Sequence, residues 1–348
     1  MTENIKFITP RDEAHWLDLR TTVLTSTEVA ALFDQSPYMT AFELWHRKAG
    51  RLDSAFEESE RTRWGTRLQD AIAMGVAEDN GWKVLRMDEF AILGDLRAGS
   101  SFDFCIGDEH ETCVCGHPKS DHIHEEGACR PGAECACDGY RLRPTALLEI
   151  KNVDHWIAKE GWIVERDGTD DYIEAPVHIE MQIQHQMLVS GVDKCYLAAL
   201  VGGNRILLSE RTPDPVVQDA IKQAITEFWR SVDAGEEPVP NFERDAEVIF
   251  RLHGFAESGK LVEASDHVSA LAVEQANLGR AIKELETKRD ALKAEILTEI
   301  GDAEKVTWEG GSISAGMVAE AEIAYTRKPY RGFRVTLKKP KPPADAAD

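Results

Sequence analysis

The sequence has 348 residues, of which 43% are hydrophobic, and a formal net charge of −22 at pH 7, which is enough for two or three folded units with apolar cores. It contains no run of 18 uncharged apolar residues, and its N-terminus lacks the apolar segment of a signal peptide, so we expect a cytoplasmic protein without a membrane span. The acidic balance argues against nucleic-acid partners unless basic groups gather on one face.

The first predicted elements are helices within residues 11–50. Trp16 and Arg20 belong to the first helix, and Thr25-Ser26-Thr27-Glu28 is typical of a capping segment that begins the second. A further helix ends at Gly50. Hydroxyl and backbone N–H groups at a helix N-terminus can bind phosphate, although ordinary capping and a surface arginine explain the same residues.

The candidate chemistry lies on two short strands further along. A helix over residues 61–80 and a strand over Lys83–Leu93 come first. Asp103 then lies in one apolar run, and Glu149 and Lys151 in the next. Strand alternation places Glu149 and Lys151 on one face, and a hairpin would bring Asp103 opposite Glu149. Such carboxylates hold Mg²⁺ or Mn²⁺, which support phosphodiester hydrolysis, although Glu-x-Lys also fits an ordinary salt-bridged surface strand.

Residues 109–143 are predicted to be an insertion between these two strands. Five of the seven cysteines of the chain fall in this segment, and a clustered, odd number of cysteines in a cytoplasmic chain favours metal over disulfides. A segment so short and polar can fold around a structural Zn²⁺ with four ligands; the alternative is a flexible loop with reduced thiols. The leading ligands are Cys113, Cys115, Cys129 and Cys137, with His117 and Cys135 as substitutes, in a run that also holds His122 and His124.

Two glutamines mark the next predicted helix. Gln182 and Gln186 are four residues apart on an otherwise apolar helix, so they share one face. That face either covers a cleft or is exposed to solvent. A hairpin over Cys195–Ser209 and a helix from Asp214 to Val232 follow.

The C-terminal third has a different pattern. Residues 236–260 are predicted as a linker and residues 261–300 as a coiled-coil helix, because apolar residues recur in steps of three and four. Gln275 and Arg289 interrupt this seam, so an intramolecular helical hairpin competes with an oligomeric coiled coil. Residues 301–348 are predicted as a small β-rich basic tail, which either contacts DNA or a partner or is simply solvated. Its strands are expected at Val306–Trp308, Ile323–Tyr325 and Phe333–Leu337.

Four stretches, in this order, resemble the YqaJ-type viral recombinase family, the lambda-exonuclease-like branch of the PD-(D/E)xK nucleases. They are Trp16–Arg20 with Leu24–Ala31, Trp64–Ala71, Asp103 with Glu149-x-Lys151, and Met181–Leu188. The resemblance implies an α/β fold, with a restriction-endonuclease-like nuclease core over residues 1–235 that carries the zinc insert and is followed by the coiled-coil and β extension.

The resemblance also implies a function. It is that of a metal-dependent exonuclease acting 5′→3′ on linear double-stranded DNA ends in phage-type recombination, a homo-oligomer that feeds a single-strand annealing protein. Two other functions remain open, a DNA-end-binding module with impaired catalysis and a structure-specific endonuclease of the same superfamily.

Site residues follow from the same resemblance. Asp103, Glu149 and the backbone carbonyl of Ile150 would hold Mg²⁺ or Mn²⁺, and Lys151 would activate or orient the attacking water, with Gln182 positioning both. Arg20 and Thr27 match positions that bind the terminal 5′-phosphate of DNA, to which Ser101 could add a hydroxyl. The family glutamate on the helix over residues 61–80 is Gln69 here, next to Asp70, so weaker or fewer bound metals are expected.

Overall fold

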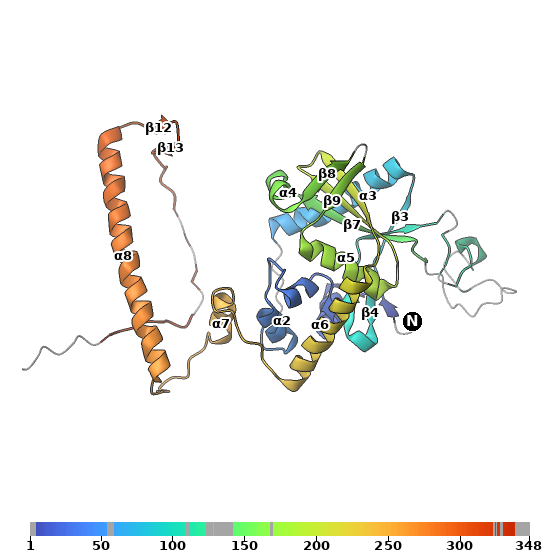
Figure 1. Cartoon of the computed structure of the whole chain (residues 1–348), viewed down its shortest axis with the longest axis horizontal. Helices are drawn as coiled ribbons and strands as arrows, with labels where there is room; N and C mark the ends of the chain where they lie inside the picture. Colours follow the sequence, from blue (N-terminus) through green and yellow to red (C-terminus); the bar gives the residue numbers. More distant parts are fainter. Residues whose placement is uncertain are drawn as a thin grey trace, which may run out of the picture. The chain divides into compact units, whose positions relative to one another are not determined.

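The computed structural model describes residues 5–53, 59–108, 111–113, 115–122, 128, 142–167, 170–322, 324, 326–327 and 330–337. The chain divides into two compact units, Met1–Arg251 and Leu252–Asp348 (Figure 1). Among the residues described, no helix combines the length and the apolar character needed to cross a membrane.

A five-stranded sheet forms the centre of the first unit. β10 runs parallel to β7, and all other neighbours in the sheet are antiparallel. The predicted pairing of the Asp103 and Glu149 runs is confirmed, because Phe104 of β6 lies opposite Leu148 of β7 and this register brings Asp103 opposite Glu149. The strand order is β11 (Arg205–Arg211), β10 (Cys195–Val201), β7 (Ala146–Val153), β6 (Phe104–Gly107) and β3 (Lys83–Arg86).

Side-chain alternation along β7 divides its residues between two cores. Leu148 packs in the core beneath α3 (Glu60–Asn80), and Leu147 packs in the core beneath α5 (Val177–Ser190). Glu149 therefore lies on the α5 side. Burial of each leucine contributes about 1.5–3 kcal/mol to the stability of the fold. A shift of the strand by one residue would move Glu149 into the apolar core under α3, and this cost fixes the register of β7.

A second sheet of four strands lies against α5, with the order β1 (Ile5–Ile8), β4 (Phe90–Leu93), β5 (Ala98–Ser100) and β2 (Leu24–Thr25). The single strand predicted over Lys83–Leu93 is therefore wrong. Its two halves belong to different sheets, because the chain leaves the first ladder at Met87, which is buried, and passes through the exposed Asp88 before β4 begins.

The predicted N-terminal helices correspond to α1 (Glu13–Thr22) and α2 (Ala41–Lys48). The helix expected to begin at Thr25–Glu28 is instead a short 3-10 helix, η1 (Val29–Phe33). The Glu28 carboxylate accepts the backbone N–H of Thr25 at 2.9 Å and pairs with Lys48 Nζ at 2.8 Å. This segment folds around a largely buried ion pair rather than offering a free helix N-terminus.

The remaining elements of the first unit complete its surface. α6 starts at Pro215 after the Asp214 cap, as predicted. The stretch expected as a linker, residues 236–260, contains α7. The part that precedes α7 is held against α2, because the buried Asp245 carboxylate accepts the Thr40 hydroxyl and the backbone N–H of Asn241. These elements are α4 (His155–Gly161), β8 (Ile163–Asp167), β9 (Asp170–Glu174), α6 (Pro215–Ala234), α7 (Ala246–Leu252), and the 3-10 helices η2 (Gly94–Leu96) and η3 (Lys119–Asp121).

The second unit consists of one long helix and a hairpin. α8 (Asp266–Ile300) is continuous, which rules out a helical hairpin within it. β12 (Lys305–Trp308) pairs with β13 (Gly311–Ser314) across Glu309-Gly310, because a two-residue turn with glycine favours a local partner. The strand predicted at Phe333–Leu337 is wrong, since that segment forms no strand. Ile323 and Tyr325 lie outside the described residues.

Candidate active site

The centre of the site is the charged pair on β7 and the aspartate that precedes β6. Lys151 Nζ lies 2.5 Å from Glu149 Oε1. Asp103 Oδ2 accepts the backbone N–H of Ile150 at 2.9 Å, which holds the aspartate beside the middle of β7. The structure therefore brings together Asp103, Glu149 and Lys151 as the sequence predicted.

Both predicted glutamines of α5 contact Glu149. Gln182 donates from Nε2 to Glu149 Oε1 at 2.6 Å, and Gln186 donates from Nε2 to Glu149 Oε2 at 2.8 Å. Lys151 also donates to the side-chain carbonyl of Gln182 at 3.3 Å. Both glutamines are buried, so the exposed-face interpretation is wrong. Gln186 was not predicted as a site residue, although its spacing of four from Gln182 pointed to it.

The α3 side of the site contains Gln69. Its Nε2 donates to Asp103 Oδ1 at 2.9 Å, so the residue that replaces the family glutamate does reach the aspartate. The neighbouring Asp70 is exposed and pairs with Arg86 at 2.6 Å. Gln69 rather than Asp70 therefore faces the candidate metal ligands.

Burial and charge shift the ionisation of this cluster. Burial and the nearby Glu149 carboxylate raise the pKa of Asp103 to about 7, while Lys151 acts in the opposite direction. Burial would lower the pKa of Lys151, but the charges of Glu149 and Asp103 outweigh it and hold that pKa above its ordinary value. At neutral pH, Lys151 is thus an ammonium, and it lies beside two carboxyl groups whose charges repel each other when both are ionised.

These residues fit a hard divalent cation. Asp103 and Glu149 offer oxygen ligands, and the repulsion that raises the pKa of Asp103 is what a cation between them would relieve. Lys151 neutralises only one of the two negative charges, so the cluster retains a net negative charge when both carboxylates are ionised.

A cleft of about 670 Å³ connects this centre with the predicted phosphate residues, since Lys151, Gln182, Arg20 and Thr27 all line it. Arg20 Nη2 lies 3.4 Å from Thr27 Oγ1, and its guanidinium stacks over the Trp16 ring at 4.7 Å.

Three further side chains complete the surroundings of this cleft. Ser101 accepts the Trp16 indole N–H at 2.8 Å and so joins the phosphate corner through that ring. Tyr38 and His178, which were not predicted as site residues, also line the cleft with their rings edge to face. Burial and the Lys151 charge lower the pKa of His178, so its imidazole is neutral at pH 7.

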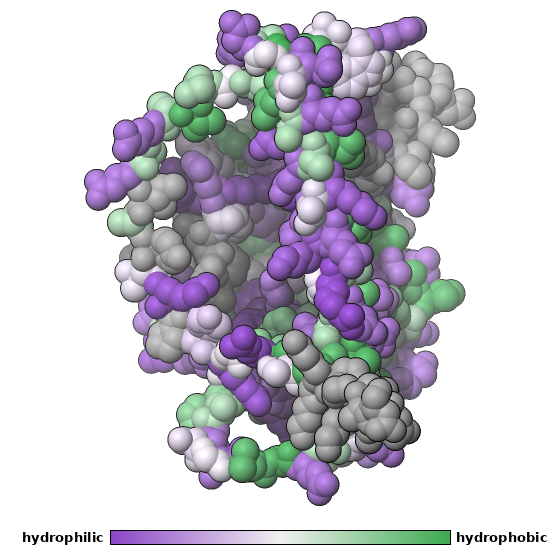
Figure 2. Space-filling model, turned by 90° about the vertical axis from the view of Figure 1, so that its left-hand side faces the viewer, coloured by the Kyte–Doolittle hydropathy of each residue, from purple (hydrophilic) through white to green (hydrophobic). Residues whose placement is uncertain are grey.

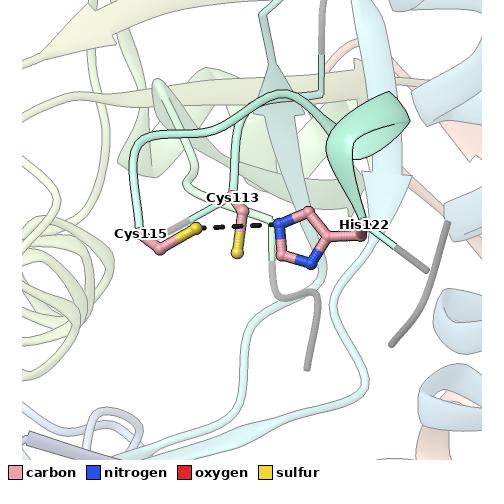
Figure 3. A group of neighbouring side chains, drawn as sticks. All are labelled: Cys113, Cys115 and His122. Carbon is pink, nitrogen blue, oxygen red and sulfur yellow. Dashed lines mark hydrogen bonds between the residues drawn. The ribbon is translucent and has the colours of Figure 1, made fainter. Parts of the chain in front are cut away.

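A second cluster lies in the predicted insert. The ligand atoms of Cys113, Cys115 and His122 all lie within 4.8 Å of one another. The Cys115 sulfur points toward the His122 ring, 3.6 Å from Nε2 (Figure 3), and lies 3.5 Å from His117 Nδ1.

Against the effect of burial, hydrogen bonds with the backbone and side chain of His117, then with Cys113 and His122, lower the pKa of the Cys115 thiol to about 5. The structure thus brings together the predicted ligands Cys113 and Cys115. The third residue of this cluster is His122 rather than His117. Cys129, Cys135 and Cys137 lie outside the described residues.

The family described as YqaJ-like viral recombinase domain matches residues 15–193. A protein of Bacillus subtilis (strain 168), named "Uncharacterized protein YqaJ", is 24% identical over 298 residues, which cover 84% of this chain and 79% of that protein.

Two solved structures were also found to be similar. An alkaline exonuclease, LHK-Exo from Laribacter hongkongensis, has 16% identity and a TM-score of 0.41, covering 68% of this chain and 99% of its own. A phage related exonuclease from Haemophilus somnus 129PT has 11% identity and a TM-score of 0.35, covering 65% of this chain and 89% of its own.

Proposed function

The chain belongs to the family of YqaJ-like viral recombinase domains and is a DNA nuclease, and we propose that it removes nucleotides from the ends of linear duplex DNA in the 5′→3′ direction. The observation that carries this proposal is the convergence of Asp103, Glu149 and Lys151 beside a cleft that also holds Arg20 and Thr27. A single cleft then offers both a hydrolytic centre and a site for a terminal phosphate.

Asp103, Glu149 and the Ile150 carbonyl would hold the Mg²⁺ or Mn²⁺ ion. When bound, such an ion supplies a Lewis acid for the phosphoryl oxygen and lowers the pKa of an attacking water. Lys151 lines the cleft as an ammonium and would orient that water or stabilise charge that develops on the phosphate. Gln182 holds Lys151 and Glu149 in place through its two amide atoms.

The end of the DNA would lie at the other part of the cleft. Arg20 donates to a neutral hydroxyl, that of Thr27, and so keeps a positive charge for a terminal 5′-phosphate. Lys48 lines the same cleft, but its charge is matched by Glu28. Ser101 supports this corner through its hydrogen bond with Trp16. We further propose a role in phage-type recombination in the host cytoplasm, where the resulting single strand would pass to an annealing protein.

Digestion of a 5′-phosphorylated linear duplex and of a closed circle of the same sequence tests the proposal. We expect the linear DNA to be degraded only with Mg²⁺ or Mn²⁺, and the circle to survive. Cleavage of the circle would favour the structure-specific endonuclease instead. Retention of both DNAs, with binding to the linear ends alone, would favour an end-binding module.

Replacing Gln69 by glutamate is expected to lower the Mg²⁺ concentration needed for half-maximal cleavage. The Gln69 amide contacts Asp103 but contributes no negative charge. A carboxylate there would add a third anionic group to the pair formed by Asp103 and Glu149. An Mg²⁺ titration of the cleavage rate measures this, with wild-type activity expected only at several millimolar, about the range of weak oxygen sites, and with Mn²⁺ more effective than Mg²⁺.

Asp70→Asn is the matched control for Gln69→Glu, because Asp70 is the adjacent α3 residue and faces Arg86 instead. Its titration curve should superimpose on that of the wild type. If Gln69→Glu also gave the wild-type curve, α3 would not contribute to the metal site.

We also propose that the insert binds a structural Zn²⁺ through Cys113, Cys115 and His122, with a fourth ligand from elsewhere in residues 109–143. Two thiolates and an imidazole are ligands that Zn²⁺ prefers. Protein purified under reducing conditions without added metal should contain about one Zn²⁺ per chain. His122→Ala should lower that content, whereas Cys105→Ala, at a buried cysteine of β6, should not. Zinc content near zero in the wild type would contradict the site.

A further inference from the structure

An apolar stripe runs along α8 without a covering partner among the residues that the structure describes. α8 has 35 residues, none of them buried. The face of the molecule drawn in Figure 2 is mostly hydrophilic, with hydrophobic side chains scattered over it. A helix in water gains most of its stability by packing its apolar face, so this stripe needs a partner. Its members are 50 to 64% exposed: Val268, Leu271, Leu278, Ile282, Leu285 and Leu292.

The stripe has the heptad spacing of a two-helix coiled coil. Leucine occupies every d position from Leu271 to Leu292, while the a positions alternate between apolar residues and the polar Gln275 and Arg289. At the C-terminal end of α8, a pocket is lined by Ile313 of β13 together with Arg289, Leu292 and Ile296, so the β12–β13 hairpin borders the last part of the seam. The partner must therefore match about three and a half heptads and accept one arginine within the seam.

We propose that α8 pairs with α8 of a second copy of this chain in an antiparallel coiled coil whose two-fold axis passes beside Arg280. This inference concerns assembly and is independent of the proposed nuclease activity. The alternative, a parallel pair in register, concentrates positive charge in one heptad. Arg289 would face Arg289 of the second copy within the seam, and Lys288 would face Lys293 on both flanks, since g and e' positions meet in parallel pairs.

The antiparallel pair removes these conflicts. Leu278 then packs against Ile282 of the second copy at the axis, and each later layer again pairs an a position with a d position. The two copies of Arg289 lie about 27 Å apart at a rise of 1.5 Å per residue. In the antiparallel pair, Glu274 of each copy lies opposite Lys288 of the other copy, which gives one ion pair on each side of the axis. In a parallel pair, Glu274 would instead lie opposite Gly279 of the second copy.

Small residues occupy the positions that meet across the axis. Gly279 would face Gly279 of the second copy on one flank, and Ala281 would face Ala281 on the other. A Cβ added at Gly279 would meet nothing within 4 Å in the single chain, so packing within one chain does not require glycine at this position. The glycine does allow two helices to approach closely at the centre of the seam.

Sedimentation equilibrium of the full chain tests both the pairing and its direction. The wild type should associate, and Ile282→Asp, at the centre of the seam, should weaken association by at least about 100-fold because it buries a charge. Lys288→Glu should weaken association about tenfold in the antiparallel pair, because Glu274 then meets a like charge twice. The double variant Glu274→Lys/Lys288→Glu should restore wild-type association.

Lys283→Glu makes the same charge change at a b position outside the seam and should leave association unchanged. Stronger association of Lys288→Glu would overturn the antiparallel direction, because it would relieve the Lys288–Lys293 repulsion of a parallel pair. A monomeric wild type would overturn the pairing altogether, as would association that Ile282→Asp leaves unchanged.

Discussion

Lys151→Ala and Glu149→Gln are each expected to lower the rate of DNA cleavage by about 10²–10³-fold or more. Lys151 is a permanent cation at the cleft, 2.5 Å from Glu149 Oε1, and its removal takes away the charge that would stabilise the phosphate during hydrolysis. Glu149→Gln removes a charged ligand for the metal while nearly preserving its shape. Single-turnover digestion of a linear duplex at saturating Mg²⁺ measures both effects.

Lys194→Ala is the matched control for these variants. Lys194 precedes β10 in the same sheet, but it is only partly buried and pairs with Glu210, so its loss should leave the rate unchanged. Lys151→Ala leaves a buried carboxylate without its cation, which itself destabilises the fold, and a thermal melt must show each variant folded at the assay temperature. Wild-type rates in folded Lys151→Ala and Glu149→Gln would contradict the assigned centre.

Asp103→Asn is expected to stabilise the fold at pH 8 in buffer free of Mg²⁺ and Mn²⁺. Burial and Glu149 raise the pKa of Asp103 from 3.8 to about 7, so between these values the folded state retains a proton that the unfolded state has lost. The contribution of Asp103 to stability is therefore fully present below about pH 4 and is lost as the pH rises through about 7. The neutral amide avoids this loss, which amounts to at most about 4 kcal/mol.

Urea unfolding at pH 5 and pH 8 measures the Asp103→Asn effect. The free energy of unfolding of the variant should exceed that of the wild type mainly at pH 8. Adding Mn²⁺ should reduce this difference, because the cation stabilises the folded wild type through its two carboxylates. Gln69 can rotate its amide to accept from the new NH₂ group, so the hydrogen bond at this position is retained. Asp70→Asn removes an exposed carboxylate on α3, next to Gln69, and its free energy of unfolding should show no such pH dependence. An equal free energy of unfolding for Asp103→Asn and wild type at pH 8 would contradict the electrostatic account.

Strand periodicity predicted that Asp103, Glu149 and Lys151 lie together, and the family resemblance singled them out as a candidate site. The two-residue spacing of Glu149 and Lys151 specifies a shared face, and pairing of two apolar runs specifies that Asp103 lies opposite. The contacts that complete the site are not local in sequence. Gln186 reaches Glu149 only because α5 packs over β7, and neither residue's sequence neighbourhood encodes that packing.

The errors of sequence prediction also have physical causes. The split of Lys83–Leu93 between two sheets depends on which distant strand each half meets, and this cannot be inferred from propensity. Thr25–Glu28 has the composition of a helix cap, but Lys48 of α2 forms an ion pair with Glu28. The segment therefore folds around the Lys48–Glu28 pair. The strand predicted at Phe333–Leu337 does not form, whereas β12 pairs with β13 across a two-residue turn.

Binding of Mn²⁺ to the DNA-free protein at pH 8, followed by the electron paramagnetic resonance signal of the free ion, tests the central claim most directly. Asp103 and Glu149 should together bind Mn²⁺ in the wild type and in Asp70→Asn, which has lost an exposed carboxylate of α3 that pairs with Arg86. Asp103→Asn should lose that binding. Equal Mn²⁺ binding by Asp103→Asn and wild type would contradict the claim that these two carboxylates form the metal site of the nuclease.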